Sequence, residues 1–234
     1  MARKTNIRWE IIRRAPLLVA ELLLKRGLST VLSIAWRMHL NPFAFLSGRA
    51  DTPGRFYIQQ FLVQYAAGCR GRFLEFGDRR YHGLFAPIVI ERYDIIDVAR
   101  APGVTIVADI QHCPAILDNT YDVIICTQVL EHVANPFLAA AELFRILKPG
   151  GRLLLTVPAA YPYHAVPRDY WRFTRDSLQL LFGERFRDLQ IAPWGNRVTV
   201  VAAYWFWAHY HVPQHVLTQI DPDNPQILSV CARK

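Results

Sequence analysis

The sequence has few cysteines and no long uninterrupted apolar run, and each shortage excludes a class of protein. Its four cysteines show no C-x-x-C spacing and no neighbouring histidine cluster, so a structural zinc site is not expected. They are typical of free core thiols in a reducing compartment. The apolar stretch 198–208 has eleven residues, whereas a membrane-spanning helix needs about 18 or more. These cysteines are Cys69, Cys113, Cys126 and Cys231.

Acidic residues are also in short supply. Nineteen Asp and Glu stand against 27 Lys and Arg, which leaves a formal net charge of +8. Such a charge favours anionic neighbours: phosphorylated substrates, anionic lipid headgroups or nucleic acid. Nucleic acid is not favoured, because no RNA-binding module or long basic run is present. With 234 residues, 52% of them apolar, we expect one folded domain with appendages.

The N-terminal part has its own pattern. Apolar residues recur at helical spacing over 7–46, accompanied by basic residues and by Trp9 and Trp36. Glu21 interrupts the apolar run and no small-residue cleavage site follows, so a signal peptide is not expected. We predict a helical extension with a linker that ends near Gly54. It lies on an anionic membrane surface or packs on the main domain, and both remain open.

The chain is therefore predicted to divide into an extension at 1–54 and an α/β domain at 55–234. After a helix at 56–67, short apolar runs alternate with helical segments, which predicts a parallel sheet flanked by helices. A helix at 136–147 is the clearest, because Asn135 can cap it and Pro136 suits its first turn. The strands are predicted at 73–77, 93–98, 104–108, 122–127, 152–157, 186–191 and 198–205.

In an open parallel sheet, ligands bind at the carboxyl ends of the strands. Glu75 and Gly77 end the first predicted strand, Asp97 the second and Asp109 the third. A carboxylate such as that of Asp97 can accept hydrogen bonds from both hydroxyls of a ribose. The alternative, a solvated aspartate in a turn, remains open.

Three segments carry a resemblance to a known family. They read YDVIICTQVLEHV, ELFRILKPGGRLLLTVP and YPYHAVPRDYWRFT. Together with RFLEFG and YDIIDV before them, they follow the order of class I S-adenosylmethionine-dependent methyltransferases, which the chain resembles over about 72–174 and most closely in the type 11 group. The last segment resembles a bacterial subgroup linked to cell-surface polysaccharide or lipopolysaccharide assembly. The resemblance implies a Rossmann-like, seven-stranded, mostly parallel sheet with helices on both faces, and S-adenosylmethionine as cofactor.

The resemblance also assigns cofactor contacts. Glu75 and Gly77 match the motif that approaches the methionine part of the cofactor, and Asp97 matches the ribose-binding acid. Asp109 and Ile110 match the segment that borders the adenine. Each of these roles is what the resemblance implies.

The acceptor side follows from the fourth and fifth predicted strands. Gln128 matches the segment beside the methyl group, and Glu131 the part of it that faces the acceptor. His132 is expected to face the protein. His164, in the loop after the fifth strand, is the candidate base for a sugar hydroxyl, because its unperturbed pKa is near ~6.5. Asp169 orients that imidazole or binds a hydroxyl itself.

The same loop carries candidate substrate-binding residues. Tyr163 and Tyr170 offer aromatic faces suited to stacking on a sugar, and Arg172 suits a phosphate-linked glycan. The alternative is that the tyrosines pack the loop on the core and that the arginine lies at the surface. We therefore expect a small-molecule, glycan or glycolipid acceptor, and a cytoplasmic protein with optional contact to the inner face of the membrane. No metal-ligating residue is predicted.

The turn after Gly77 departs from the family pattern. Relatives read G-x-G-x-x-P-Y-x-x-L-F, whereas residues 77–85 are two residues shorter and lack the second glycine. We hypothesise that Arg79 or Arg80 binds the cofactor carboxylate that backbone amides would otherwise hold. The alternative is a methyltransferase-like domain with weakened cofactor binding that serves as a scaffold or glycan-binding partner. A nicotinamide enzyme fits poorly, because its G-x-G-x-x-G turn is missing.

Overall fold

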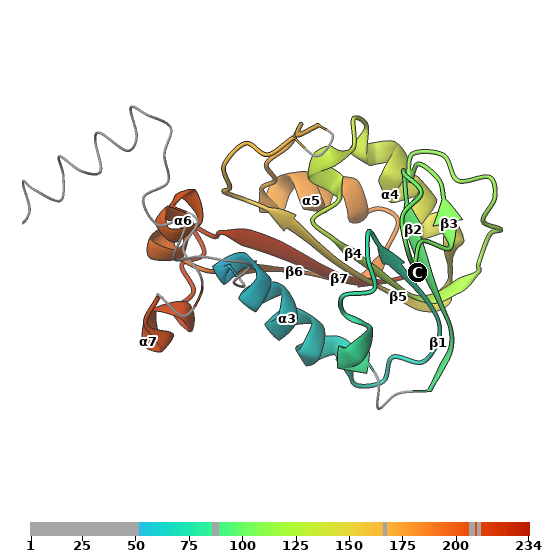
Figure 1. Ribbon diagram of the computed structural model, residues 1–234, viewed down its shortest axis with the longest axis horizontal. Helices are drawn as coiled ribbons and strands as arrows, with labels where there is room; N and C mark the ends of the chain where they lie inside the picture. The colour runs from blue at the N-terminus through green and yellow to red at the C-terminus, as the bar shows by residue number, and fades with distance from the viewer. Residues whose placement is uncertain (1–51, 86–88, 166–167, 206–208, 210–211) are drawn as a thin grey trace, which may run out of the picture. The chain divides into compact units, whose positions relative to one another are not determined.

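Figure 1 shows the computed structural model of the chain, which describes residues 52–85, 89–165, 168–205, 209 and 212–234. These residues belong to one compact unit that spans 49–234. The predicted helical extension lies, over residues 1–51, outside the described residues, and so do Trp9 and Trp36, whose contact with a membrane surface or with the main domain was left open. Within the described ranges, no helix combines the length and the apolar character that crossing a bilayer requires.

A sheet of seven strands runs through the described part of the chain in the order β3-β2-β1-β4-β5-β7-β6. Strand β7 is antiparallel to both of its neighbours, and the other pairs are parallel. The predicted seven-stranded, mostly parallel sheet is therefore confirmed. The strands are β1 Gly71–Phe76, β2 Ile90–Asp97, β3 Ile106–Val107, β4 Tyr121–Thr127, β5 Leu147–Pro158, β6 Arg187–Trp194 and β7 Ile227–Arg233.

Helices cover both faces of this sheet, as predicted (Figure 1). Successive side chains of a strand point to opposite faces, and each face has its own apolar cluster. Leu74 of β1 packs in the cluster that contains α4 and α5, whereas Phe73 packs in the cluster that contains α3. The helices are α3 Pro53–Ala66, α4 Pro136–Ile146, α5 Arg175–Phe182, α6 Arg197–Tyr204 and α7 Gln214–Leu217, with short 3-10 turns η1 His82–Phe85 and η2 Leu130–His132.

The capping signals decide where the helices begin. The Asn135 side chain accepts hydrogen bonds from the backbone amides of Phe137 and Leu138, which confirms the predicted start of α4. Helix α3 begins at Pro53, earlier than the predicted residue 56, because Thr52 caps it and Pro53 occupies its first turn. The first residues of α3 lie beside the ligand pocket described below.

The prediction of a strand at 198–205 is wrong. This segment forms helix α6, because the Asn196 side chain accepts from the amides of Val198 and Thr199 and Thr199 completes a capping box. Its run of β-branched residues favours a strand only where no cap fixes the helical start. The seventh strand is β7, at the C-terminal end of the sequence, between β5 and β6. The four cysteines are free and buried, as predicted.

Candidate functional site

A pocket of about 370 Å³ opens at the carboxyl ends of β1 and β4. Its size falls within the usual range of small-molecule sites, which is about 300–1,000 Å³. The first turn of α3 and the loop after β5 form its other walls. Its lining includes Arg55, Gly77, Asp78, Arg80, Tyr81, Thr127, Gln128, Tyr161, His164 and Gln226. The structure thus brings together Gly77, Gln128 and His164, which the sequence analysis selected separately.

Glu75 organises the turn after β1 from inside the protein. Its side chain is 1% exposed and accepts hydrogen bonds from the backbone amide of Tyr81 and from the hydroxyl of Tyr93. Burial raises the pKa of Glu75 to about 7. Glu75 therefore holds the turn in place, and Tyr81, which it anchors, lines the pocket.

Side chains border the turn after β1. Gly77 has φ +85°, and of the described atoms none lies within 4 Å of where its Cβ would be. Asp78 pairs with Arg80 at 2.8 Å. The guanidinium of Arg79 lies 5.2 Å from the ring centroid of Tyr93. The two arginines therefore border the turn, Arg80 directly on the pocket.

Gln128 adopts a conformation that suggests a functional constraint. Its φ of 53° is in the left-handed region, which costs a residue other than glycine about 1 kcal/mol or more. The backbone amide of Gln128 donates to the carbonyl of Thr156, and its side chain donates to the hydroxyl of the same residue. These bonds to β5 hold Gln128 at the end of β4, where it lines the pocket.

Asp97 and Asp109 lie at the neighbouring strand ends and do not line this pocket. Asp97 ends β2, and its carboxylate accepts from the amide of Ala99. Asp109 follows β3 and accepts from the backbone and side chain of Gln111. Ile110 is buried in the core. Since β2 and β3 follow β1 in the sheet, the three residues flank the pocket along one edge.

Glu131 is the most unusual group at this edge. It lies in η2, directly after β4, and its side chain is fully buried. Both of its carboxyl oxygens lack a hydrogen-bond partner among the described residues. Burial raises the pKa of Glu131 to about 8. Nε2 of His132 lies 3.9 Å from Oε1 of Glu131.

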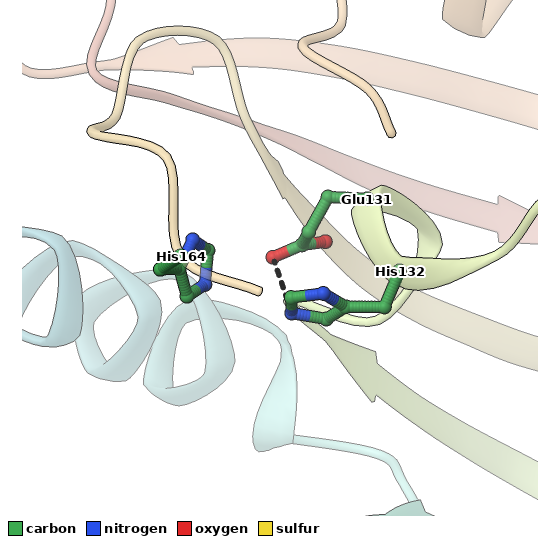
Figure 2. Close-up of side chains that lie close together, drawn as sticks. All are labelled: Glu131, His132 and His164. Atoms are coloured by element: carbon green, nitrogen blue, oxygen red, sulfur yellow. Dashed lines mark ion pairs between the residues drawn. The ribbon is translucent and has the colours of Figure 1, made fainter. Parts of the chain in front are cut away.

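His132 and His164 meet beside Glu131 (Figure 2). Their ring centroids are 4.9 Å apart in an edge-on arrangement. His132 was expected to face the protein, and its side chain is mostly covered, with 18% exposed. Burial and the neighbouring His132 lower the pKa of the His164 imidazole. His164 is therefore neutral at neutral pH.

Asp169 and Arg172 fix the loop that carries His164. The carboxylate of Asp169 is 2% exposed and accepts two hydrogen bonds from the guanidinium of Arg172. This pairing lowers the pKa of Asp169 below its usual range. Asp169 also accepts from the backbone amide of His164, and its Oδ2 lies 3.4 Å from Nδ1 of that imidazole. Arg172 donates in addition to the carbonyls of Tyr161 and Pro162.

The remaining predicted substrate residues are at the surface. Tyr163 is 77% exposed and Tyr170 is 44% exposed, and neither lines the pocket. The backbone amide of Tyr170 donates to the carbonyl of Glu131. The backbone of Tyr170 thus joins the loop after β5 to η2.

Sequence reasoning missed two contributors to the site. Tyr93 holds Glu75 from β2, and Gln226, just before β7, reaches the pocket with a buried side-chain amide. Gln226 was not predicted as a site residue, because β7 itself was not predicted. The signal for β7 was available in the apolar run 227–232 near the C-terminus.

Comparison with known families agrees with this architecture. Residues 91–155 match a family model described as a methyltransferase domain. A protein of Streptomyces fradiae, an uncharacterized 37.1 kDa protein in transposon TN4556, is 37% identical over 73 residues. That match covers 29% of this chain and 21% of the relative, so the chain spans about a fifth of the relative's length.

Solved structures share the fold at low sequence identity. An S-adenosylmethionine-dependent methyltransferase from Archaeoglobus fulgidus is similar with a TM-score of 0.51 and 16% identity, over 77% of this chain and 94% of that one. Phosphoethanolamine N-methyltransferase 2 of Haemonchus contortus, in complex with S-adenosyl-L-methionine, is similar with a TM-score of 0.57 and 13% identity. This match covers 82% of the present chain and 56% of that protein. The 4+2 cyclase SpnF shares the fold as well, with a TM-score of 0.51 and 16% identity over 76% of this chain and 80% of that one.

Proposed function

We propose that the protein is an S-adenosylmethionine-dependent methyltransferase that methylates a hydroxyl group of a saccharide or of a glycolipid precursor. The family match over residues 91–155 and the sheet order support a class I methyltransferase with S-adenosylmethionine as its cofactor. The observation that carries the proposal is the pocket at the carboxyl ends of β1 and β4, where an open glycine, a constrained glutamine and a neutral histidine meet.

The cofactor would lie along the carboxyl edge of the sheet. Its methionine part would lie over Gly77, since the space that a Cβ would fill there is open. Its ribose would be bound by Asp97 and its adenine would lie beside Asp109 and Ile110, in the order of the strands. A guanidinium of the turn would bind the cofactor carboxylate. Arg80, which lines the pocket, is the better placed of the two arginines.

S-adenosylmethionine, when bound, would supply a methyl group to the acceptor oxygen by in-line displacement, with the electron pair of the broken carbon–sulfur bond staying on sulfur. The hydroxyl proton passes to the imidazole of His164, which is neutral and can accept it. Alignment of oxygen, methyl carbon and sulfur supplies most of the rate.

The loop after β5 would position the acceptor. Asp169 and Arg172 hold one another in a bidentate ion pair, so we assign them to fixing the backbone of His164 and not to contacting the acceptor. Tyr163 and Tyr170 are exposed near this loop and are free to stack on a sugar ring. The basic charge of the chain suits a phosphate-linked glycan.

Methyl transfer can be measured directly. The full chain is incubated with methyl-labelled S-adenosylmethionine and a panel of nucleotide sugars, lipid-linked sugars and phosphoethanolamine, and products are identified by mass spectrometry. We expect label on a sugar oxygen together with S-adenosylhomocysteine. Label on the nitrogen of phosphoethanolamine alone would contradict hydroxyl methylation, and an Asp97→Asn variant that transfers as fast as an Asp176→Asn control would contradict the proposed ribose contact.

A further inference from the structure

The cluster of Glu131, His132 and His164 has a composition that methyl transfer does not require. Each residue offers one potential ligand atom, and these atoms all lie within 4.8 Å of one another. Figure 2 shows the three side chains directed toward one common space, two of them from η2 and one from the loop after β5. We propose that this cluster binds a divalent transition-metal ion.

Glu131 is the first reason. A carboxyl group that is fully buried and has no hydrogen-bond partner among the described residues is costly in either protonation state. Buried polar groups without partners are rare, and an ion is one of their few explanations. Arg172 acts on Glu131 only through space, because its guanidinium is bonded to Asp169. A cation between Glu131 and the histidines would compensate the buried carboxylate.

His132 is prepared to act as a ligand. Its Nδ1 is hydrogen-bonded to the backbone carbonyl of Arg168, so Nδ1 must carry the proton. In the neutral ring Nε2 keeps its lone pair, and Nε2 is the atom that lies 3.9 Å from Glu131 Oε1. Metal-ligating histidines usually donate their other ring N–H to a carbonyl or a carboxylate in this way.

His164 has the corresponding arrangement with a carboxylate. Its Nδ1 lies 3.4 Å from Oδ2 of Asp169, and Arg172 holds that carboxylate in place. The buried Nδ1 has no hydrogen-bond partner among the described residues, so a shift of a few tenths of an ångström would complete the bond to Asp169. His132 is thus backed by an acceptor that selects the tautomer a metal needs, and Asp169 would do the same for His164 once that bond forms.

The donor set indicates the class of metal. Two imidazoles and one carboxylate suit Zn²⁺ and other divalent first-row ions, whereas Mg²⁺ and Ca²⁺ prefer oxygen ligands. Ligand atoms about 2.1 Å from a tetrahedral ion are about 3.4 Å apart, so the distances between the three ligand atoms must shorten by about 1 Å on binding. Three protein ligands leave a coordination position for another molecule, as in catalytic zinc sites.

The cluster adjoins the proposed active site, because His164 also lines the pocket. If the proposed function holds, the ion would bind the acceptor hydroxyl and lower its pKa. With the ion bound, His164 would act as a ligand in place of the base role proposed above, and the hydroxyl proton would leave to solvent. This role rests on the proposed function, whereas metal binding itself does not.

Metal binding is tested on the full chain after dialysis against a chelator. Calorimetric titration with Zn²⁺ should give one equivalent of tight binding, and Co²⁺ should give the visible absorption of a bound ion. Glu131→Gln and His164→Asn should each weaken Zn²⁺ binding by about tenfold or more. His215→Asn, which changes an exposed histidine of α7, is the matched control and should bind as the unaltered protein does.

Thermal unfolding supplies a second readout. Zn²⁺ should raise the melting temperature of the unaltered protein and of His215→Asn, but not of Glu131→Gln. No Zn²⁺ uptake by the unaltered protein, or unchanged affinity in both ligand variants, would overturn the proposal. Titration with S-adenosylhomocysteine in chelator separates the two proposals: cofactor binding without zinc binding removes only the metal site, and zinc binding without cofactor binding removes only the proposed function.

Discussion

Two buried glutamates stand at the carboxyl ends of neighbouring strands, and their surroundings differ completely. Glu75, in β1, accepts hydrogen bonds from the amide of Tyr81 and the hydroxyl of Tyr93. Glu131, just after β4, has no hydrogen-bond partner for either carboxyl oxygen in the described part of the chain. The side chains are 1% and 0% exposed, so burial does not distinguish them.

The difference separates a structural carboxyl group from one available to a ligand. The hydrogen bonds of Glu75 hold the turn after β1, and so they contribute to the fold. Neither carboxyl oxygen of Glu131 takes part in a hydrogen bond within the described part of the chain, and the neighbours of Glu131 are two histidines. Variants around Glu131 should therefore change chemistry with little effect on stability, and variants around Glu75 should do the reverse.

The largest effect is expected on the side of Glu131. His164→Ala should lower the turnover of methyl transfer by about 100-fold or more, since a base or metal ligand at the reacting hydroxyl is lost. Its melting temperature in chelator should stay close to that of the unaltered protein, because the imidazole is 35% exposed. The His215→Ala control should retain its turnover. Full turnover in His164→Ala would remove this histidine from the chemistry.

On the side of Glu75, stability should change instead. Glu75→Ala leaves the Tyr93 hydroxyl and the Tyr81 amide without their acceptor, and we expect a loss of about 2–3 kcal/mol in the free energy of unfolding. Urea denaturation measures it. Tyr93→Phe removes one of the two bonds and should cost less. A Glu75→Ala protein as stable as the unaltered one would end the structural interpretation of Glu75.

The turn held by Glu75 offers a smaller test, of ligand affinity. The Arg79→Ala, Arg80→Ala double variant should bind S-adenosylmethionine about tenfold more weakly, because a guanidinium bound to the cofactor carboxylate is lost. Methylthioadenosine lacks that carboxylate and should bind both proteins equally. Calorimetry decides the point, and equal weakening for both ligands would show that the arginines shape the turn without contacting the carboxylate.

The smallest effect is the pH dependence of stability between pH 7 and pH 8. Burial raises the pKa of Glu75 to about 7 and that of Glu131 to about 8, so between the unfolded value of about 4.5 and these values the folded protein binds more protons. Stability should therefore fall as pH rises through this window, by about 1 kcal/mol per pH unit for each group. Between pH 7 and pH 8 only Glu131 still contributes.

Glu131→Gln should flatten the decline between pH 7 and pH 8 in chelator, as measured by urea denaturation at each pH. Glu142→Gln is a useful control, because the pKa of Glu142 is lowered by its bond to Arg145 and the variant should keep the decline. If the free energy of unfolding of Glu131→Gln declined with pH as steeply as that of the unaltered protein, ionisation of the Glu131 carboxyl would cost the folded protein little free energy.

The sequence predicted much of the sheet, because its acidic strand ends and helix caps are local signals. Asp97 ends β2 and Asp109 follows β3, and Asn135 caps α4. Strand β7 was missed because a β-branched run elsewhere resembled a strand and the cap at Asn196 was overlooked. The error arose because two local signals, a β-branched run and a helix cap, compete over the same residues.

The site was less predictable, because it depends on contacts between distant segments. His164 was selected from the sequence, but its approach to His132 and Glu131 follows from the bonds that join the loop after β5 to η2. Nothing in the sequence shows that the Glu131 carboxyl lacks a partner. The partners of Glu75 come from the turn and from β2, and pairing of this kind appears only in three dimensions.

Titration with S-adenosylhomocysteine tests the central claim most directly, because it needs no knowledge of the acceptor. The account predicts that the full chain binds one equivalent by calorimetry and that Asp97→Asn weakens this binding while Asp176→Asn does not. If neither S-adenosylhomocysteine nor S-adenosylmethionine binds, the pocket between β1 and β4 is no cofactor site, and the domain keeps the methyltransferase fold without its reaction.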